Sequence, residues 1–285
     1  MLHLGCVTYN LLKDWDLETI IRKLEEAGYE AVELRTEHKH GVERTLTSGQ
    51  RKEITARFQR SKVRLLSYGS TCEFESPDAA VRRKQIEIGK EWVDLAHDTG
   101  AWGVKVRPNG IARGETVDST VPRIAECLRE LGDYGQGHGV EIWMEVHGHT
   151  TQNPPVSAAI MKATKHDNVG LCWNSNPTDV VDGSVKASFE MLKPWIRNAH
   201  INDLSNDYPW RELFKLAKLN FGRKKGLVWH TTRHEFVSRH AENTGDPVLT
   251  QQLARHKDLR TTQGYFHVRE SRLLKAAVRL NRKAE

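Results

Sequence analysis

The stretch from Asp207 to Arg233, DYPWRELFKLAKLNFGRKKGLVWHTTR, separates two different sequence patterns. Before it, short β-rich runs alternate with segments of helical periodicity, whereas the chain after it has the pattern of basic helices without strands. We therefore divide the 285-residue chain into two unrelated pieces, residues 1–220 and residues 221–285.

The distribution of charge supports this division. The net charge is +6, but residues 221–285 hold 14 Lys and Arg against 6 Asp and Glu, while residues 1–220 hold 29 against 31. A compact basic segment has an electrostatic reason to bind DNA, although a solvated helix surface would explain the charge equally well. The N-terminus has no signal-peptide pattern and no window approaches a membrane span, so we expect a cytoplasmic protein with no membrane partner.

The pattern of residues 1–206 predicts parallel strands joined by crossover helices, as in a (β/α) barrel. Six helices are expected to begin near Leu17, Glu43, Asp78, Asp118, Pro155 and Ser184, and a seventh covers 209–220. The seven predicted strands cover residues 4–9, 31–35, 63–69, 103–108, 140–148, 168–175 and 197–204.

Polar residues collect at the carboxyl ends of these strands, which is the rim where barrel enzymes build their active sites. Glu145, Asn174 and His200 together offer a carboxylate, an amide oxygen and an imidazole, a donor set that suits Mn²⁺, Mg²⁺ or Zn²⁺. On spacing alone, polar residues hydrogen-bonded at strand ends account for them equally well. Further candidates, for binding the substrate, are Glu33, Arg35, Lys105, Arg107 and His147.

The phrases VELRTEHKHGVE, GVKVRPNG, EVHGHT, GLCWNSNPTD, NAHINDL and YPWRELFKL occur in this order over residues 1–220. This part of the chain resembles the xylose isomerase-like TIM barrels, a family of sugar phosphate isomerases and epimerases. The resemblance implies a divalent metal ion held by strand-end residues, with Glu145 as the first ligand and His200 as the third. It also implies that Glu145 acts as acid and base while the metal polarises a small sugar or sugar phosphate.

Two departures from the family pattern stand out. Asn174 occupies the position where many members have Asp, which removes a negative charge from the metal site. The eighth strand, which should end in Glu, has no counterpart, because the apolar run 227–229 ends in His230. The expected fold is therefore α/β, an incomplete (β/α)8 TIM barrel with seven predicted parallel strands, followed by a small all-α C-terminal segment.

Residues 221–285 carry the ordered motifs HTTRH (230–234), LARHK (253–257) and TTQGY (261–265). This segment resembles the C-terminal catalytic fragment of tyrosine recombinases and phage integrases. The resemblance implies that Tyr265 attacks a DNA phosphate, that Arg233 holds its oxygens, and that His230 and His256 assist proton transfer, without a metal or other cofactor.

The recombinase pattern is also incomplete, since the family has a second Arg and a hairpin Lys upstream that this chain lacks. Arg211 belongs by context to the last barrel helix, so we expect weak strand cleavage at most. Three hypotheses remain: an isomerase or epimerase-like barrel impaired by truncation, a recombinase-type segment that binds or breaks DNA, and a fusion relic in which neither site works.

Overall fold

A computed structural model describes residues 4–201, 208–218, 246–248 and 251. The chain forms two compact units, Met1–Leu213 and Phe214–Glu285. Nearly all described residues belong to the first unit. In the described part of the chain, no helix is both long enough and apolar enough to cross a membrane.

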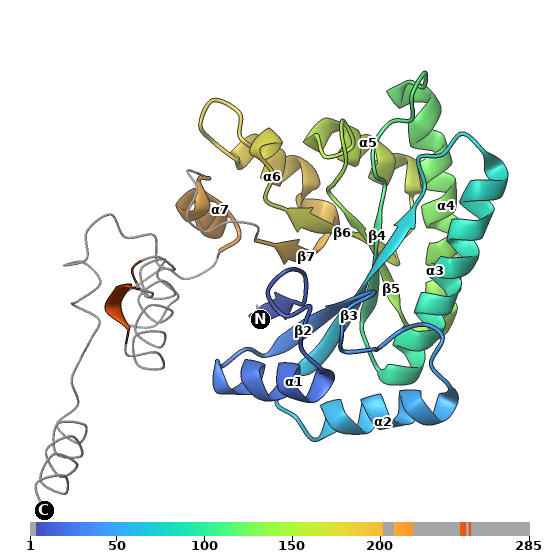
Figure 1. Ribbon diagram of the computed structural model, residues 1–285. Helices are drawn as coiled ribbons and strands as arrows, with labels where there is room; N and C mark the ends of the chain where they lie inside the picture. The colour runs from blue at the N-terminus through green and yellow to red at the C-terminus, as the bar shows by residue number, and fades with distance from the viewer. Residues whose placement is uncertain (1–3, 202–207, 219–245, 249–250, 252–285) are drawn as a thin grey trace, which may run out of the picture. The chain divides into compact units, whose positions relative to one another are not determined.

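The first unit is built on one parallel sheet of seven strands in the order β1-β2-β3-β4-β5-β6-β7 (Figure 1). This topology confirms the predicted α/β class and the seven parallel strands. The strands are β1 (Gly5–Val7), β2 (Ala31–Arg35), β3 (Arg64–Glu73), β4 (Gly103–Arg107), β5 (Glu141–Glu145), β6 (Val169–Asn174) and β7 (Ile196–His200).

Helices follow the strands, as the alternation predicted, and α3 and α4 lie side by side along the sheet (Figure 1). They are α1 (Leu17–Glu26), α2 (Ser48–Gln59), α3 (Ala79–Thr99), α4 (Val117–His138), α5 (Pro154–Thr164), α6 (Lys186–Leu192) and α7 (Trp210–Leu216). Two short 3-10 helices, η1 (Pro177–Asp179) and η2 (Lys193–Trp195), lie in the loops that follow β6 and α6.

Helix α2 begins later than predicted, at Ser48 and not near Glu43. Thr47 caps it, because its hydroxyl accepts the Gln50 backbone N–H while the Gln50 side chain accepts the Thr47 backbone N–H. This reciprocal capping box satisfies amide groups that the first helical turn leaves unpaired. The cap, and not the acidic residue upstream, therefore sets the start of the helix.

The core lies between the sheet and the helices that cover it. Helix α1 shows the pattern, since it buries Leu17, Ile20, Ile21 and Leu24 at the spacing of one helical face. The central strands β4 and β6 are buried along almost their whole length, as expected for parallel strands covered by helices.

The sheet curls so that strands distant in the sequence meet at their carboxyl ends. The side chain of His200 on β7 reaches Glu33 on β2, with 3.2 Å between Nε2 and Oε2. Among the described residues, β1 pairs only with β2 and β7 only with β6, so the sheet keeps two unpaired edges. The curl nevertheless gathers inward-facing side chains from β2, β4, β5 and β7.

The predicted helices of the C-terminal segment, 231–243, 248–255 and 270–283, lie almost entirely outside the described residues. The recombinase-like residues His230, Arg233, His256 and Tyr265 also lie outside them. Their roles stay predictions.

Candidate active site at the carboxyl ends of the strands

Four charged or titratable side chains form a buried cluster: Glu145 and His200 at the carboxyl ends of β5 and β7, and Glu33 and Lys105 in the middle of β2 and β4. Glu33, Lys105 and Glu145 are only 3%, 5% and 7% exposed. In a strand, alternate residues point to the same face, so one position in each strand suffices to aim a side chain inward. The cluster lies where barrel enzymes place their catalytic groups.

The contacts within the cluster use the carboxylate oxygens in a defined way. Glu145 accepts the Lys105 ammonium at Oε2, 2.6 Å away, and faces His200 Nδ1 from Oε1 at 3.4 Å. Glu33 accepts His200 Nε2–H at Oε2, and its Oε1 lies 3.8 Å from Lys105 Nζ. His200 is therefore held from both sides, and Lys105 bridges the two carboxylates.

Strand β3 makes room for the cluster with small residues. Ser67 donates its hydroxyl to Glu33 Oε2 at 2.9 Å. At Gly69, an added Cβ would lie 2.8 Å from Glu33 Oε1, so a larger residue would displace that carboxylate. The small residues of β3 thus let Glu33 lean towards Lys105 and His200.

The four groups determine one another's protonation. Burial acts to raise the pKa of Glu33 and Glu145, but the positive charges of His200 and Lys105 outweigh it and hold both pKa values below the ordinary range. Burial acts to lower the pKa of His200 and Lys105, yet neighbouring groups outweigh it and raise both. For His200 these groups are the carboxylates of Glu33 and Glu145, because burial raises the pKa of the Cys172 thiol and keeps it uncharged. Two carboxylates therefore face two cations, and the buried charge is balanced.

Asn174 lies beside this cluster because it pairs with His200 in the register of β6 and β7. The residue is 6% exposed, and its Oδ1 is buried without a hydrogen-bond partner among the described residues. A buried carbonyl oxygen without a partner is costly and calls for a donor, a water molecule or an ion.

Glu145, His200 and Asn174 are the residues that could hold a divalent ion. Ligand atoms about 2.0–2.3 Å from an ion lie about 3 Å from one another when they are adjacent, and Glu145 Oε1 and His200 Nδ1 are 3.4 Å apart. Glu33 would hold the other ring nitrogen, as carboxylates do for metal-binding histidines. Asn174 Oδ1 supplies a third donor. Among the described residues, however, no three His, Cys, Asp or Glu side chains form a group that could hold a metal.

The other predicted substrate-binding residues lie around the cluster and not within it. Arg107 is ion-paired with Glu73, and the guanidinium of Arg35 lies 4.4 Å from the centre of the Tyr9 ring. His147 follows β5 and is half buried, and burial lowers its pKa. The structure thus divides the predicted set, with Glu33 and Lys105 inside the cluster and Arg35, Arg107 and His147 outside.

A second buried network follows Asn174 and was not predicted from the sequence. Asp179 accepts the Asn176 backbone N–H at 3.0 Å and the Tyr208 hydroxyl at 2.8 Å, and Trp173 Nε1 donates to the same hydroxyl at 3.3 Å. Asn176 also donates its amide to the Val146 carbonyl at 2.7 Å. The network fixes the loop after β6 against the end of β5. The one signal in the sequence is the stretch NPTD (176–179), a short turn that ends in an acidic residue.

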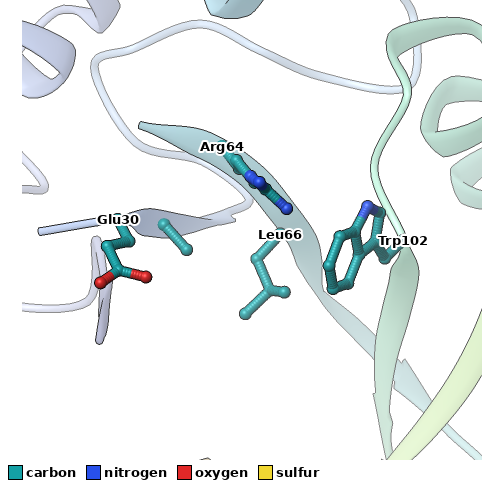
Figure 2. A pocket seen from close by; sticks show the side chains of 5 residues that line it. Glu30, Arg64, Leu66 and Trp102 are labelled. Carbon is teal, nitrogen blue, oxygen red and sulfur yellow. The ribbon is translucent and has the colours of Figure 1, made fainter. Parts of the chain in front are cut away.

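The pocket in Figure 2 lies at the opposite end of the sheet. It is lined by Glu30, Ala31, Arg64, Leu66 and Trp102, which are at or near the amino ends of β2, β3 and β4. The Arg64 side chain extends towards Trp102, with its guanidinium carbon 5.9 Å from the ring centre. In barrels, this end serves stability rather than chemistry.

The sequence profile of the xylose isomerase-like TIM barrel matches residues 21–235 of this chain. The chain belongs to the xylose isomerase-like TIM barrel family. Membership confirms the resemblance drawn for the first part of the sequence and accounts for the placement of the buried cluster at the rim.

Solved structures with the same fold include several epimerases. D-psicose 3-epimerase from Clostridium cellulolyticum H10, solved with D-tagatose, has a TM-score of 0.64 at 15% identity, over 94% of this chain and 100% of that one. The 3-keto-D-glucoside 4-epimerase of E. coli has a TM-score of 0.64 at 11% identity, over 76% and 88%. The IolI protein with a bound zinc atom has a TM-score of 0.54 at 21% identity, over 61% and 63%. At these identities the likeness establishes the fold of this xylose isomerase-like barrel.

Among curated proteins, part of the chain is similar to tyrosine recombinase XerD. The XerD of Halalkalibacterium halodurans is 40% identical over 76 residues, and that of Staphylococcus aureus is 36% identical over 78 residues. Each match covers 27% of this xylose isomerase-like chain, which spans about a quarter of the length of these relatives, 25% and 26%.

Proposed function

We propose that the barrel catalyses the isomerisation or epimerisation of a small sugar or sugar phosphate, by metal-assisted proton transfer next to a carbonyl group. The observation that carries this proposal is the donor set of Glu145 Oε1, His200 Nδ1 and the buried, unpartnered Asn174 Oδ1. A relative of the same fold was solved with zinc and another with a ketose, which supports both the metal and the substrate class.

Glu145 is the proposed acid and base of this reaction. Its lowered pKa keeps it a carboxylate at neutral pH, which is the form that a base requires, although the same shift makes it a weaker base than an ordinary Glu. Lys105 holds Oε2 and thereby orients the carboxylate, while the burial of the cluster keeps water away. A bound divalent ion would polarise the carbonyl and stabilise the negative charge that develops on its oxygen.

Each remaining residue of the cluster has a supporting role. Glu33 holds His200 Nε2–H, so that Nδ1 is directed towards Glu145 and is available to a cation once it has lost its proton. Arg35, Arg107 and His147 surround the cluster and are proposed to bind substrate oxygens. Because Arg107 is already ion-paired with Glu73, it would orient hydroxyl groups with its remaining N–H groups.

The test uses isotope exchange and metal analysis together. Ketohexoses incubated with the protein and Mn²⁺ in D₂O should gain deuterium at the carbon next to the carbonyl, followed by NMR. Glu145→Gln should abolish the exchange and lower the bound metal, because it removes both the base and a ligand. Glu87→Gln, an exposed ion-pair variant on α3, is the matched control and should behave as the parent. The proposal would be contradicted if the purified protein contained no metal and its stability did not change when a chelator was added.

The second candidate function is DNA breaking and rejoining, or DNA binding, by the C-terminal segment. The partial similarity to XerD and the excess of basic residues in 221–285 support it. A working segment would form a covalent adduct on a nicked DNA substrate through Tyr265, without a metal. Tyr265→Phe should remove the adduct, while Tyr134→Phe, on α4 of the barrel, should not.

The relic hypothesis is the remaining outcome of these two tests. Weak, salt-sensitive DNA binding without an adduct would leave only an electrostatic role for the segment. If the barrel also lacked exchange and bound metal, the chain would carry two inactive sites.

A further inference from the structure

Lys105 is an unusual residue to find inside a polar site that is proposed to bind a metal ion. Its side chain is 7% exposed, and its ammonium is directed inward, towards Glu145 Oε2 at 2.6 Å and Glu33 Oε1 at 3.8 Å. A buried ammonium persists only with anionic partners, and here two carboxylates provide them. Lys105 is therefore engaged in the cluster and is not directed outward to meet substrate.

Glu145 divides its two oxygens between two positive charges. Oε2 accepts the Lys105 ammonium, and Oε1 faces His200 Nδ1, on the side where a cation would be bound. Each positive charge on one carboxylate weakens the attraction that the same carboxylate offers to the other. In this buried setting the effect is larger than it would be in water.

From this geometry we infer that Lys105 is a built-in cation that competes with a divalent ion for Glu145 and so weakens metal binding. The inference rests on the proposed metal site but concerns a residue to which no metal role has been given. Together with His200, the ammonium balances the charges of Glu33 and Glu145 when no metal is bound, and it restricts the barrel to weak, exchangeable metal binding. Lys105 is in this sense a positioning residue that acts through Glu145.

The inference predicts an increase in metal affinity, which mere damage to the site would not produce. Mn²⁺ is titrated into the parent protein and into Lys105→Met, and binding is followed by calorimetry. Lys105→Met replaces the ammonium with an uncharged side chain of similar volume. The variant should bind Mn²⁺ at least about tenfold more tightly, because the positive charge that repels the ion beside Glu145 is gone. Adding Glu145→Gln to Lys105→Met should abolish the gain, which would place the bound ion at this carboxylate.

Lys90→Met is the matched control, since Lys90 on α3 is also a lysine ion-paired with two glutamates, Glu87 and Glu130. It should bind Mn²⁺ as the parent does. If Lys105→Met fails to fold, Glu33→Gln is compared with Glu33→Gln/Lys105→Met, a double variant that loses one charge of each sign. The double variant should then bind Mn²⁺ more tightly than the single one.

The outcomes separate this inference from the proposed function. If the parent binds Mn²⁺ and folded Lys105→Met binds it no more tightly than the parent, the inference is overturned. The proposal of a metal-dependent barrel is then unaffected. Binding by Lys105→Met alone supports the inference and counts against a metal-dependent reaction in the parent. Absence of binding by either protein overturns both.

Discussion

Asp179 is a fully buried carboxyl group whose protonation is coupled to the stability of the barrel. Burial raises its pKa to about 7, and the hydrogen bonds from Tyr208 and Asn176 offset only part of that effect. In an unfolded chain the same group has a pKa near 3.8. Between these values the native state holds a proton that the unfolded state has lost, so stability should fall as the pH rises from about 4 to about 8.

Asp179→Asn should remove this part of the pH dependence. The amide can still accept the Tyr208 hydroxyl but does not ionise, so the variant should gain stability over the parent as the pH rises, by up to about 4 kcal/mol. Urea unfolding at pH 5 and pH 8 measures the difference, and Asp118→Asn, an exposed residue of the first turn of α4, is the control. Parallel stability profiles for the parent and Asp179→Asn would contradict the argument.

At the level of single residues, the sequence predicted the polar groups of the rim but not their contacts. Glu145 could be found because it ends the largely buried strand β5, and His200 because it ends β7 at the same rim. Lys105 was expected to bind substrate, and its actual partners depend on how far the sheet curls, which no local pattern reports. Asp179 follows Pro177 in what reads as a loop, and only tertiary packing buries it.

Helix α2 shows which signals set the ends of the elements. It buries only Phe58, whereas α1 buries four residues on one face, so α2 lacks the apolar period that predicts a helix from sequence. The acidic residue near position 43 was a weaker signal than the Thr47 cap. The predicted start of α1, which has a strong apolar pattern, therefore agrees with the structure. The predicted start of the weakly amphipathic α2 is five residues too early.

Thr47→Ala should lower the free energy of unfolding by about 1 kcal/mol, because it removes the hydroxyl that accepts the Gln50 amide. Thr47→Ser keeps the capping oxygen and should change the stability by a few tenths of a kcal/mol. Chemical denaturation of the three proteins provides the comparison. Equal losses for the alanine and serine variants would show that the methyl group of Thr47, and not its hydroxyl, stabilises the helix start.

For the barrel as a whole, we expect the two edge strands of the described sheet to open first. In the described residues, β1 and β7 each pair with one neighbour, and β1 has only three residues. Strands β4 and β5 pair on both sides and are covered by helices. Among the described strands, β6 is the one partner of the β7 backbone, so β7 should open by local fluctuations while the centre opens only with the whole barrel.

Hydrogen exchange followed by mass spectrometry should therefore show a gradient, with amides of β4 and β5 exchanging on the order of a hundredfold more slowly than those of β1 and β7.

A divalent ion bound through Glu145, Asn174 and His200 would join β5, β6 and β7. Saturating Mn²⁺ should then slow exchange in β7 and leave β1, which contributes no donor, unchanged. The Glu145→Gln variant should lose the response of β7 but keep the gradient itself, since the gradient follows from strand pairing. Equal protection across the sheet would show that the β1 and β7 edges are paired in solution. If Mn²⁺ slowed exchange in β1 as much as in β7, the ion would stabilise the barrel from a different position.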